Sequence, residues 1–214
     1  MSEYLHIFDL DKTLIQVNCS FKYYCYLRKK KIYSFKSFLI AFLYFIKYKF
    51  FHYSPKALHK SIFNIFLKNR SEKNLFSDHA KDFFDKYFFS IINQKTLYFL
   101  KKAQEKKEKV LLLSNSPKYL IKEIAKRLDI KEYFGSSYFI DKKGLFKTIE
   151  RIMDGDEKKR FVLNHIKDRK DIKVVAYSDS IWDRALLEIA DKCYIVKPDR
   201  KLKKLAKIKG WELI

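Results

Sequence analysis

Three short apolar runs along the chain each end in small polar or acidic residues. They cover residues 3–8, 109–116 and 172–180, and runs of this kind are typical of strands inside a parallel sheet. Segments with helical spacing of apolar residues separate the three runs. This alternation predicts an α/β fold, in which a mostly parallel sheet is built from βα units.

The second run leads into a segment that predicts a helix over residues 116–128. Ser116 is placed to cap this helix, and Pro117 fits its first turn. The predicted buried face carries Leu120, Ile121, Ile124 and Leu128. Further along, residues 136–149 predict a hairpin with Gly144 in the turn.

Residues 17–95 differ from the rest because they are rich in aromatic residues and poor in Gly and Pro. Their apolar residues have helical spacing, which predicts an all-helical insertion into a core of residues 1–16 and 96–214. Because open α/β sheets bind ligands beyond the carboxyl ends of their strands, the insertion is expected to lie over that site. The spacing is carried by Leu58, Ile62, Phe63, Phe66, Phe83, Phe84, Tyr87 and Phe88.

One segment of the insertion, residues 37–46, is uncharged and lies between Lys36 and Lys47. A helix that crosses a bilayer needs about 20 apolar residues, so this segment does not predict a transmembrane helix. Two alternatives are open: a helix buried in the core, or an interfacial helix that lies on anionic lipid.

The composition is that of a folded protein. With 214 residues, 48% of them hydrophobic, the chain suits one α/β domain, or a core with a smaller insertion. The three cysteines match neither a disulfide framework nor a zinc site, and the first residues do not resemble a secretory signal. A cytoplasmic location is therefore expected.

The formal net charge of +22 favours contact with phosphates, anionic lipid or nucleic acid, although a general bias towards lysine explains the same excess. No recognisable nucleic-acid-binding motif accompanies the charge, so nucleic acid is not the favoured partner. Peripheral contact with the inner face of an anionic membrane is an alternative, and the oligomeric state is open.

Candidate chemical groups follow each predicted strand. Asp9 and Asp11 come directly after the first strand, where both side chains can approach one ligand. Two crowded carboxylates repel each other unless a cation or a shared proton relieves them, and Mg²⁺ prefers such oxygen ligands. Asp179 and Asp183 follow the third strand, one helical turn apart, so that both can face the same cleft.

A phosphate fits the remaining polar residues. Ser114 and Asn115 end the second strand just before a helix, where an anion is readily bound. In the segment DGDEKKRFVLNHI, Lys158 or Lys159 opens a helix and can offset charge on phosphoryl oxygens. Lys158 is preferred because Val162 and Leu163 follow at +4 and +5, which keeps its helical face inward.

In this order, DLDKT, LLLSNS, DEKK and YSDSIWD resemble the four motifs of the haloacid dehalogenase (HAD) superfamily. The place of the insertion, the form SNSP and the C-terminal segment resemble subfamily IB, the phosphoserine-phosphatase-like group. The segment FDLDKTLIQVNCSFKYYCYLRKKK has a looser likeness to phosphatidylglycerophosphatase C. The resemblance implies a Rossmann-like core with an all-helical cap of the C1 type, and a phosphatase that uses Mg²⁺.

For the first motif the resemblance implies that Asp9 is the nucleophile, which forms an aspartyl-phosphate, and that Asp11 is the general acid and base. It also implies that Mg²⁺ is held by the side chains of Asp9 and Asp179 and by the main-chain carbonyl of Asp11.

For the other motifs it implies that Ser114 and the N–H of Asn115 bind one phosphoryl oxygen. Lys158 would bind another, and Asp183 would orient this lysine. Trp182 stands where the group commonly has Asn, and Lys12 where Gly is frequent; Lys12 is expected to point away from the site if strand alternation continues.

The substrate implied is a phosphomonoester, either a lipid phosphate such as phosphatidylglycerophosphate or a small metabolite phosphate. The segment QVNCS lacks the acidic residue of phosphoserine phosphatases, so phosphoserine is not favoured. Two other classes are open: a nucleic-acid-binding protein or polynucleotide phosphatase, and a non-catalytic binding module.

Overall fold

The described part of the protein, residues 3–51, 54–167 and 171–214 of a computed structural model, contains one sheet of seven strands. The strands lie in the order β4-β3-β2-β1-β5-β6-β7, and all neighbours are parallel except β3 and β4. The predicted α/β fold is thus confirmed. The bounds are β1 (Glu3–Phe8), β2 (Lys109–Pro117), β3 (Glu132–Ile140), β4 (Phe146–Arg151), β5 (Ile172–Ser178), β6 (Lys192–Ile195) and β7 (Glu212–Leu213).

Helices cover both faces of the sheet because its central strands are apolar on both sides. In β1, Leu5 and Ile7 pack towards α7 and α8, whereas Phe8 belongs to the core under α5 and α6. The helices that accompany the sheet are α5 (Gln94–Glu105), α6 (Lys118–Arg127), α7 (Gly155–Ile166), α8 (Arg184–Leu187) and α9 (Arg200–Lys209).

The helix predicted after β2 has the expected face, since Leu120, Ile121, Ile124 and Leu128 are all buried. Its predicted cap is wrong. β2 continues through Pro117, which itself stands at the N-cap position, and no side chain caps the helix. Ser116 is instead drawn towards Asp11, to which its hydroxyl donates a hydrogen bond.

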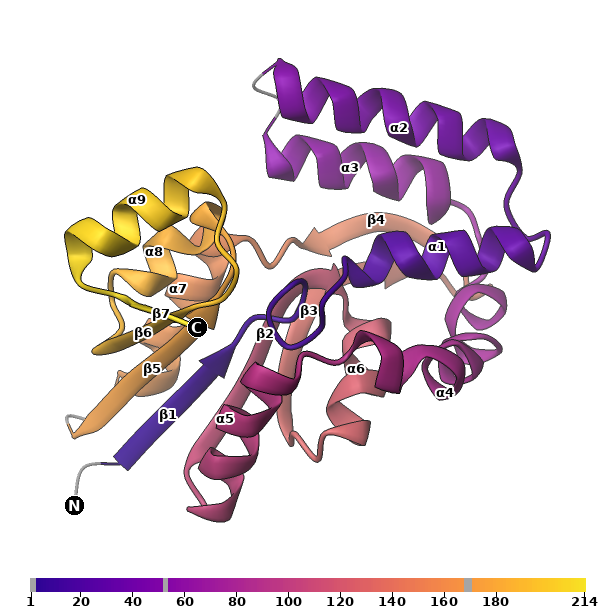
Figure 1. Cartoon of the computed structure of the whole chain (residues 1–214). Coiled ribbons are helices and arrows are strands. Elements are labelled where there is room, and N and C mark those ends of the chain that lie inside the picture. Colours follow the sequence, from indigo (N-terminus) through magenta and orange to yellow (C-terminus); the bar gives the residue numbers. More distant parts are fainter. Residues whose placement is uncertain (1–2, 52–53, 168–170) are drawn as a thin grey trace.

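The elements between residues 19 and 91 are helical, as the spacing predicts. They are α1 (Cys19–Lys29), α2 (Phe35–Phe50), α3 (Pro55–Phe66), a π-helix (Lys73–Ser77) and α4 (Ala80–Ile91). Asn18, Ser34 and Ser54 each cap the helix that follows by accepting a backbone N–H. Figure 1 shows α1, α2 and α3 beyond the end of β1, on the side to which its arrow points.

Stacked and edge-on rings hold the helices of the insertion together. Tyr23 of α1 stacks on Phe76 and meets Phe83 of α4 edge to face, while Tyr24 stacks on Phe66 of α3. Such pairs add to the area that they bury, because the edge of one ring is attracted to the face of another. The same apolar core continues into the sheet through Phe8 and Tyr177.

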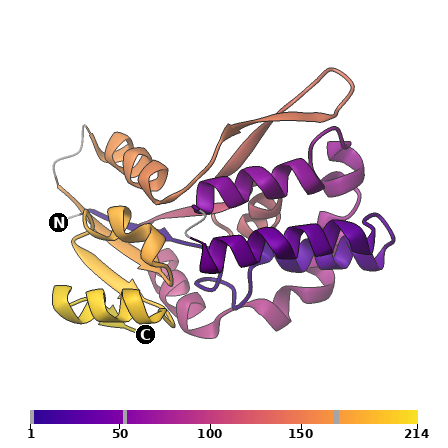
Figure 2. The same ribbon diagram turned by 90° about the horizontal axis from the view of Figure 1, so that it is seen from above.

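The hairpin β3–β4 is confirmed, with Gly144 at a φ of +76° in its turn. It also binds the insertion. Asn69 donates its N–H to the carbonyl of Phe146 at 2.7 Å, and Phe146 donates to Arg70 at 3.0 Å. These bonds fix the segment after α3 to a strand of the core, and Figure 2 shows the hairpin next to the helices of the insertion.

α2 settles one of the open alternatives. Leu39, Phe42 and Leu43 are 50%, 57% and 53% exposed, and none of the described side chains of α2 is buried. The alternative of a helix buried in the core is therefore wrong. No described helix is long and apolar enough to span a bilayer.

Candidate active site

The carboxyl ends of β1, β2 and β5 meet the first turn of α7. Phe8 at the end of β1 pairs with Leu112 of β2 and Tyr177 of β5. The next residue, Asp9, donates its N–H to the carbonyl of Tyr177 at 3.0 Å. The polar residues that follow these strands therefore lie at one edge of the sheet.

Asp9, Lys158 and Asp183 form a buried row of charges. The ammonium of Lys158 donates to Oδ1 of Asp9 at 2.7 Å, and to Oδ1 and Oδ2 of Asp183 at 2.9 Å and 3.0 Å. Lys158 is only 2% exposed and Asp183 4%. Ser178 completes the row by donating its hydroxyl to Asp183 at 2.6 Å.

α7 delivers Lys158 to this row. Asp154 caps the helix by accepting the N–H of Glu157 at 3.0 Å. Gly155 begins it, and a Cβ on this residue would collide with the main-chain carbonyl of Trp182. Val162 is buried below Lys158, as predicted, but Leu163 is exposed, so the inward face is narrower than the sequence suggests.

Asp11 is held from two sides. Oδ1 accepts the N–H of Cys19 at 2.6 Å, and Oδ2 accepts the hydroxyl of Ser116 at 2.8 Å. Ser116 in turn shares a hydrogen bond with the hydroxyl of Ser20 at 2.9 Å. Burial raises the pKa of Asp11, while the two donors lower it by binding the ionised form. The first residue of α1 thus contacts the predicted acid and base.

Replacing Ser116 by alanine is expected to move the acid limb of the pH–rate profile up by about one pH unit, because a hydrogen bond to a charged group is lost. The remaining carboxylate of Asp11 is then harder to ionise. The pH dependence of kcat for an aryl phosphate measures this shift. Ser20→Ala, which removes only the partner of Ser116, is the matched control, and an unchanged limb in Ser116→Ala contradicts the role given to Ser116.

Ser114 and Asn115 lie one strand away from Asp9. Ser114 is fully buried, and its hydroxyl accepts the N–H of Ser116 at 3.1 Å. The carbonyl and side-chain oxygens of Asn115 both accept the hydroxyl of Ser136, at 2.8 Å and 3.1 Å. Asn115 is partly exposed near the carboxyl end of β2, so its backbone is accessible at this edge of the sheet.

His59 of α3 contacts this strand end. Its Nε2 lies 3.0 Å from the hydroxyl of Tyr138, and its ring also hydrogen-bonds to the side chain of Asn115. Burial lowers the pKa of His59 from 6.5 to about 4, against the raising effects of Asn115 and Asp154. The folded protein therefore holds this imidazole neutral.

As the pH is lowered, His59 becomes protonated at about pH 6.5 in the unfolded chain but only at about pH 4 in the folded protein. The free energy of unfolding therefore decreases as the pH is lowered through this window. Between about pH 7.5 and about pH 5 we expect a loss of about 2 kcal/mol from this group. Urea unfolding of the wild type and of His59→Asn measures it, since the variant lacks this share of the loss. Equal pH dependence in the two proteins would contradict the prediction.

Asp179 follows β5 and faces the same place. Burial raises its pKa to about 7, Lys12 opposes this, and Asp183 adds to it. Burial likewise raises the pKa of Asp9 well above its ordinary value, and the charges of Asp183, Asp179 and Asp11 raise it further against the opposing effect of Lys158. For Lys158, burial alone would lower the pKa, but Asp183 and Asp9 more than reverse this.

The donor set suits a hard divalent cation. Within residues 3–51, 54–167 and 171–214, no three His, Cys, Asp or Glu side chains form a complete metal site. Mg²⁺, however, is commonly held by one or two carboxylates and completes its shell with water and phosphate oxygens. Asp9 and Asp183 contact the buried ammonium of Lys158, and the charges of Asp179 and Asp11 act on Asp9 as well, so a cation would relieve an excess of negative charge.

Lys12 and Trp182, the two positions that depart from the family pattern, lie at the rim of the site. Lys12 has a φ of +57°, so the strand alternation does not continue, and its charge lowers the pKa of both Asp11 and Asp179. The condition under which Lys12 was expected to point away from the site is therefore not met. Trp182 is 55% exposed and donates its indole N–H to the hydroxyl of Tyr48 in α2 at 2.7 Å.

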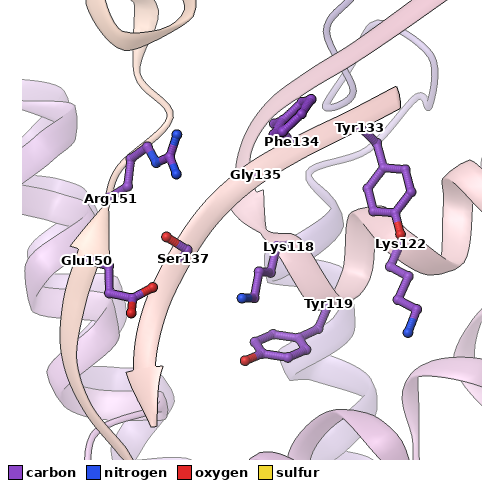
Figure 3. A pocket seen from close by; sticks show the side chains of 9 residues that line it. All are labelled: Lys118, Tyr119, Lys122, Tyr133, Phe134, Gly135, Ser137, Glu150 and Arg151. Carbon is purple, nitrogen blue, oxygen red and sulfur yellow. The ribbon is translucent and has the colours of Figure 1, made fainter. Parts of the chain in front are cut away.

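A separate hollow of about 380 Å³ lies between α6, β3 and β4. Figure 3 shows its lining side chains, which include Lys118, Lys122 and Arg151. None of the predicted site residues lines it, so it lies outside the candidate active site.

The sequence did not point to several partners of the predicted residues. Ser116, Ser178 and the N–H of Cys19 hold carboxylates of the site, and Gly155 permits the approach of α7. Thr13, part of the first motif, donates to Oδ2 of Asp9 at 3.4 Å. The small polar residues at the strand ends could have indicated these partners. Serines at two of the three strand ends, Ser116 and Ser178, donate hydrogen bonds to carboxylates of the site.

The chain matches one family of proteins and several solved structures. The family model of the haloacid dehalogenase-like hydrolases matches residues 7–188. No curated protein gives a match. Among solved structures, a protein of unknown function from Bordetella pertussis Tohama I has a TM-score of 0.87 at 15% identity, with 100% of this chain and 99% of that chain covered.

Two further structures share the fold at low identity. A phosphoserine phosphohydrolase-like protein from Francisella tularensis subsp. tularensis SCHU S4 has a TM-score of 0.70 at 18% identity, covering 100% of this chain and 95% of its own. A substrate-bound phosphoserine phosphatase complex has a TM-score of 0.67 at 15% identity, covering 100% and 93%. Because the family match runs from β1 to the segment after Asp183 and includes every predicted site residue, this chain belongs to the haloacid dehalogenase-like hydrolases.

Proposed function

We propose that the protein is a Mg²⁺-dependent phosphomonoester phosphatase that works through an aspartyl-phosphate on Asp9. The observation that supports this most directly is the buried row Asp9–Lys158–Asp183, with Asp11 two residues from Asp9. A solvent-facing cap or turn would not require a fully buried lysine between two acids. The family membership and the shared fold of phosphatases agree with this function.

Asp9 supplies the nucleophile. An oxygen of its carboxylate attacks phosphorus and forms the new P–O bond, while the bond to the alcohol oxygen of the substrate breaks in line. Lys158 holds Oδ1 of Asp9 at 2.7 Å and Thr13 donates to Oδ2, so that the carboxylate is oriented before substrate arrives. Orienting a reacting group in this way removes part of the entropic cost of the step.

Asp11 carries the proton. In the first step it donates this proton to the departing alkoxide, and in the second it takes one from the water that hydrolyses the aspartyl-phosphate. Its pKa is raised by burial, which suits a carboxyl group that must start protonated. Ser116 and the N–H of Cys19 then stabilise the carboxylate that remains.

The side chains of Asp9 and Asp179 and the main-chain carbonyl of Asp11 would hold the cation. Bound Mg²⁺ supplies positive charge that lets an anionic carboxylate approach an anionic phosphate. Ser114, the N–H of Asn115 and Lys158 would contact phosphoryl oxygens, and Asp183 keeps Lys158 in place.

The helices of residues 17–95 are proposed as a cap over the core of residues 1–16 and 96–214, of the C1 type. The contacts Cys19–Asp11, Tyr48–Trp182 and His59–Asn115 support this division, since each joins a helix of the insertion to a strand end of the core. A cap in this place would contact the alcohol portion of the substrate. The substrate is proposed to be either a lipid phosphate or a small metabolite phosphate.

A panel of phosphomonoesters tests the proposal, with and without Mg²⁺. The panel contains an aryl phosphate, phosphoserine, histidinol phosphate and phosphatidylglycerophosphate in liposomes. We expect hydrolysis that needs Mg²⁺ and is lost in Asp9→Asn. No hydrolysis of any compound would support a non-catalytic module, and hydrolysis restricted to polynucleotide ends would support the nucleic-acid alternative. The likeness to phosphatidylglycerophosphatase C and the cytoplasmic location stay predictions.

A further inference from the structure

The outward face of α2 is apolar over most of its length. Phe35, Leu39, Phe42 and Leu43 are 66%, 50%, 57% and 53% exposed. At about 100° per residue, these four side chains fall within roughly 100° of the helix circumference. Monomeric proteins seldom leave a contiguous apolar stripe of this kind in water, so the face calls for a partner.

The inward side of the same helix is already occupied. Phe38 and Ala41 pack on the main core, and α2 lies beside α3 in both views of the fold. The outward stripe is therefore not part of the packing that holds α2 in place. Sixteen residues of helix extend about 24 Å, shorter than the hydrocarbon layer, so this helix can lie on a bilayer but not cross it.

Within residues 12–71, the segment that includes α2, the charged residues are all of one sign. The sequence contains no Asp or Glu from residue 12 to residue 71, but thirteen Lys and Arg in the same stretch. A general lysine bias does not explain this, because all 25 acidic residues lie in the rest of the chain. The positive charge is therefore concentrated on the insertion that carries α2.

Part of this charge gathers where α2 begins. A hollow of about 690 Å³ is lined by Arg28, Lys29, Lys31 and Arg70 together with Phe35. The guanidinium of Arg28 lies 5.2 Å from the centre of the Phe35 ring, so that cationic and apolar groups are in direct contact. Exposed Lys36 and Lys47 continue the positive charge along the helix.

We propose that the outward face of α2 docks on an anionic lipid bilayer, with its apolar stripe at the level of the acyl chains and the surrounding cations against lipid phosphates. Amphipathic helices with apolar and aromatic residues on one face and Lys or Arg beside them bind membranes in this way. The proposal concerns binding alone and does not depend on the phosphatase activity.

Two other occupants fit the surface less well. A second copy of the chain would bring two insertions of like charge together, and no acidic residue of 12–71 is present to pair with them. Nucleic acid would pair with the cations and could stack on Phe35 and Phe42, but it would leave the aliphatic Leu39 and Leu43 in water. A bilayer satisfies both the apolar stripe and the charge.

Docking would place the active site close to the lipid surface. The hydroxyl of Tyr48, on the inward side of α2, accepts a hydrogen bond from Trp182, which lies between Asp179 and Asp183. Burial raises the pKa of Tyr48, the hydrogen bond with Trp182 lowers it, and the charges of Asp199 and Asp179 raise it further. α2 therefore joins the proposed membrane face to the rim of the site.

Vesicle co-sedimentation tests the proposal with the full-length chain. The vesicles contain phosphatidylcholine alone, or phosphatidylcholine and phosphatidylglycerol in equal parts. We expect binding to the anionic vesicles that weakens with salt, and a partition coefficient lowered at least about tenfold by the double variant Leu39→Ser/Leu43→Ser. Phe89→Ser, which changes an 86% exposed side chain on α4, is the control and should bind like the wild type.

Each result has a defined meaning. No binding of the wild type, or equal binding of the double variant, overturns the proposal. A concentration-dependent dimer in sedimentation velocity that the double variant loses would assign the face to a second copy, and salt-sensitive binding to RNA or DNA unaffected by the variant would assign the cations to nucleic acid. Hydrolysis of a soluble aryl phosphate by the double variant shows that its fold and site are intact, so a failure of docking is distinguished from a failure of the proposed catalysis.

Discussion

Replacing Asp9 by asparagine is expected to lower kcat for a phosphomonoester by about 10⁴-fold or more, because the amide cannot form the aspartyl-phosphate. The variant should fold. Burial and the nearby acids raise the pKa of Asp9, so its charge opposes folding, and the asparagine oxygen can still accept from Lys158. Kinetics under saturating Mg²⁺, together with urea unfolding, measure the two effects.

Asp156→Asn is the matched control for this experiment. Asp156 is an exposed acid in the first turn of α7, and its removal should leave both kcat and the free energy of unfolding nearly unchanged. If Asp9→Asn kept more than about one hundredth of the wild-type rate, Asp9 would not be the nucleophile. Stability is measured on the same sample because unfolding of the variant would by itself explain a loss of activity.

Lys158→Met is expected to lower the free energy of unfolding by about 3–5 kcal/mol, because it leaves the buried carboxylates of Asp9 and Asp183 without their cation. Activity should be lost as well, since Asp9 is no longer oriented and a contact to phosphate is removed. Urea unfolding at neutral pH gives the stability and an aryl phosphate gives the rate. Lys159→Met changes the adjacent, partly exposed lysine and should cost less than about 0.5 kcal/mol.

A second substitution separates lost charge balance from lost packing. In Lys158→Met/Asp183→Asn one of the two uncompensated carboxylates is removed, so part of the stability should return while activity does not. Equal stability of Lys158→Met and Lys159→Met would contradict this explanation. So would a double variant whose loss in the free energy of unfolding exceeds the sum of the losses of Lys158→Met and Asp183→Asn.

Much of the fold could be predicted because the pattern that specifies it is local. The three strands with apolar runs lie within a residue or two of their predicted places, and the buried face of α6 has the predicted members. The short strands β6 and β7 were not identified from the sequence. With four and two residues, they are too short to show a period and are defined by pairing with β5 and with each other.

The acids and the lysine of the site could be predicted from their order along the chain, which reflects the order of the strands. Their partners could not. Ser116 was interpreted as a cap because its position before a helix is a local signal, whereas its contact with Asp11 joins residues 105 positions apart. Gly155 likewise has no special backbone angle and is required by the neighbouring carbonyl of Trp182.

For α2 the sequence left two alternatives because periodicity alone does not tell what a helix packs against. Ten uncharged residues suit a protein core as well as a lipid surface. The absence of acids over residues 12–71, by contrast, could be read from the sequence, and it distinguishes the insertion from a chain with lysine spread evenly.

The hydrogen bond from the N–H of Cys19 to Asp11 lets the insertion influence the protonation of Asp11. α1 begins at Cys19, and the N–H of this residue lowers the pKa of Asp11. A displacement of α1 by even one ångström would break a bond of 2.6 Å and leave the proton more firmly on Asp11. In the mechanism proposed above, hydrolysis of the aspartyl-phosphate uses the ionised form of Asp11, so the contact with α1 would favour the attack of water.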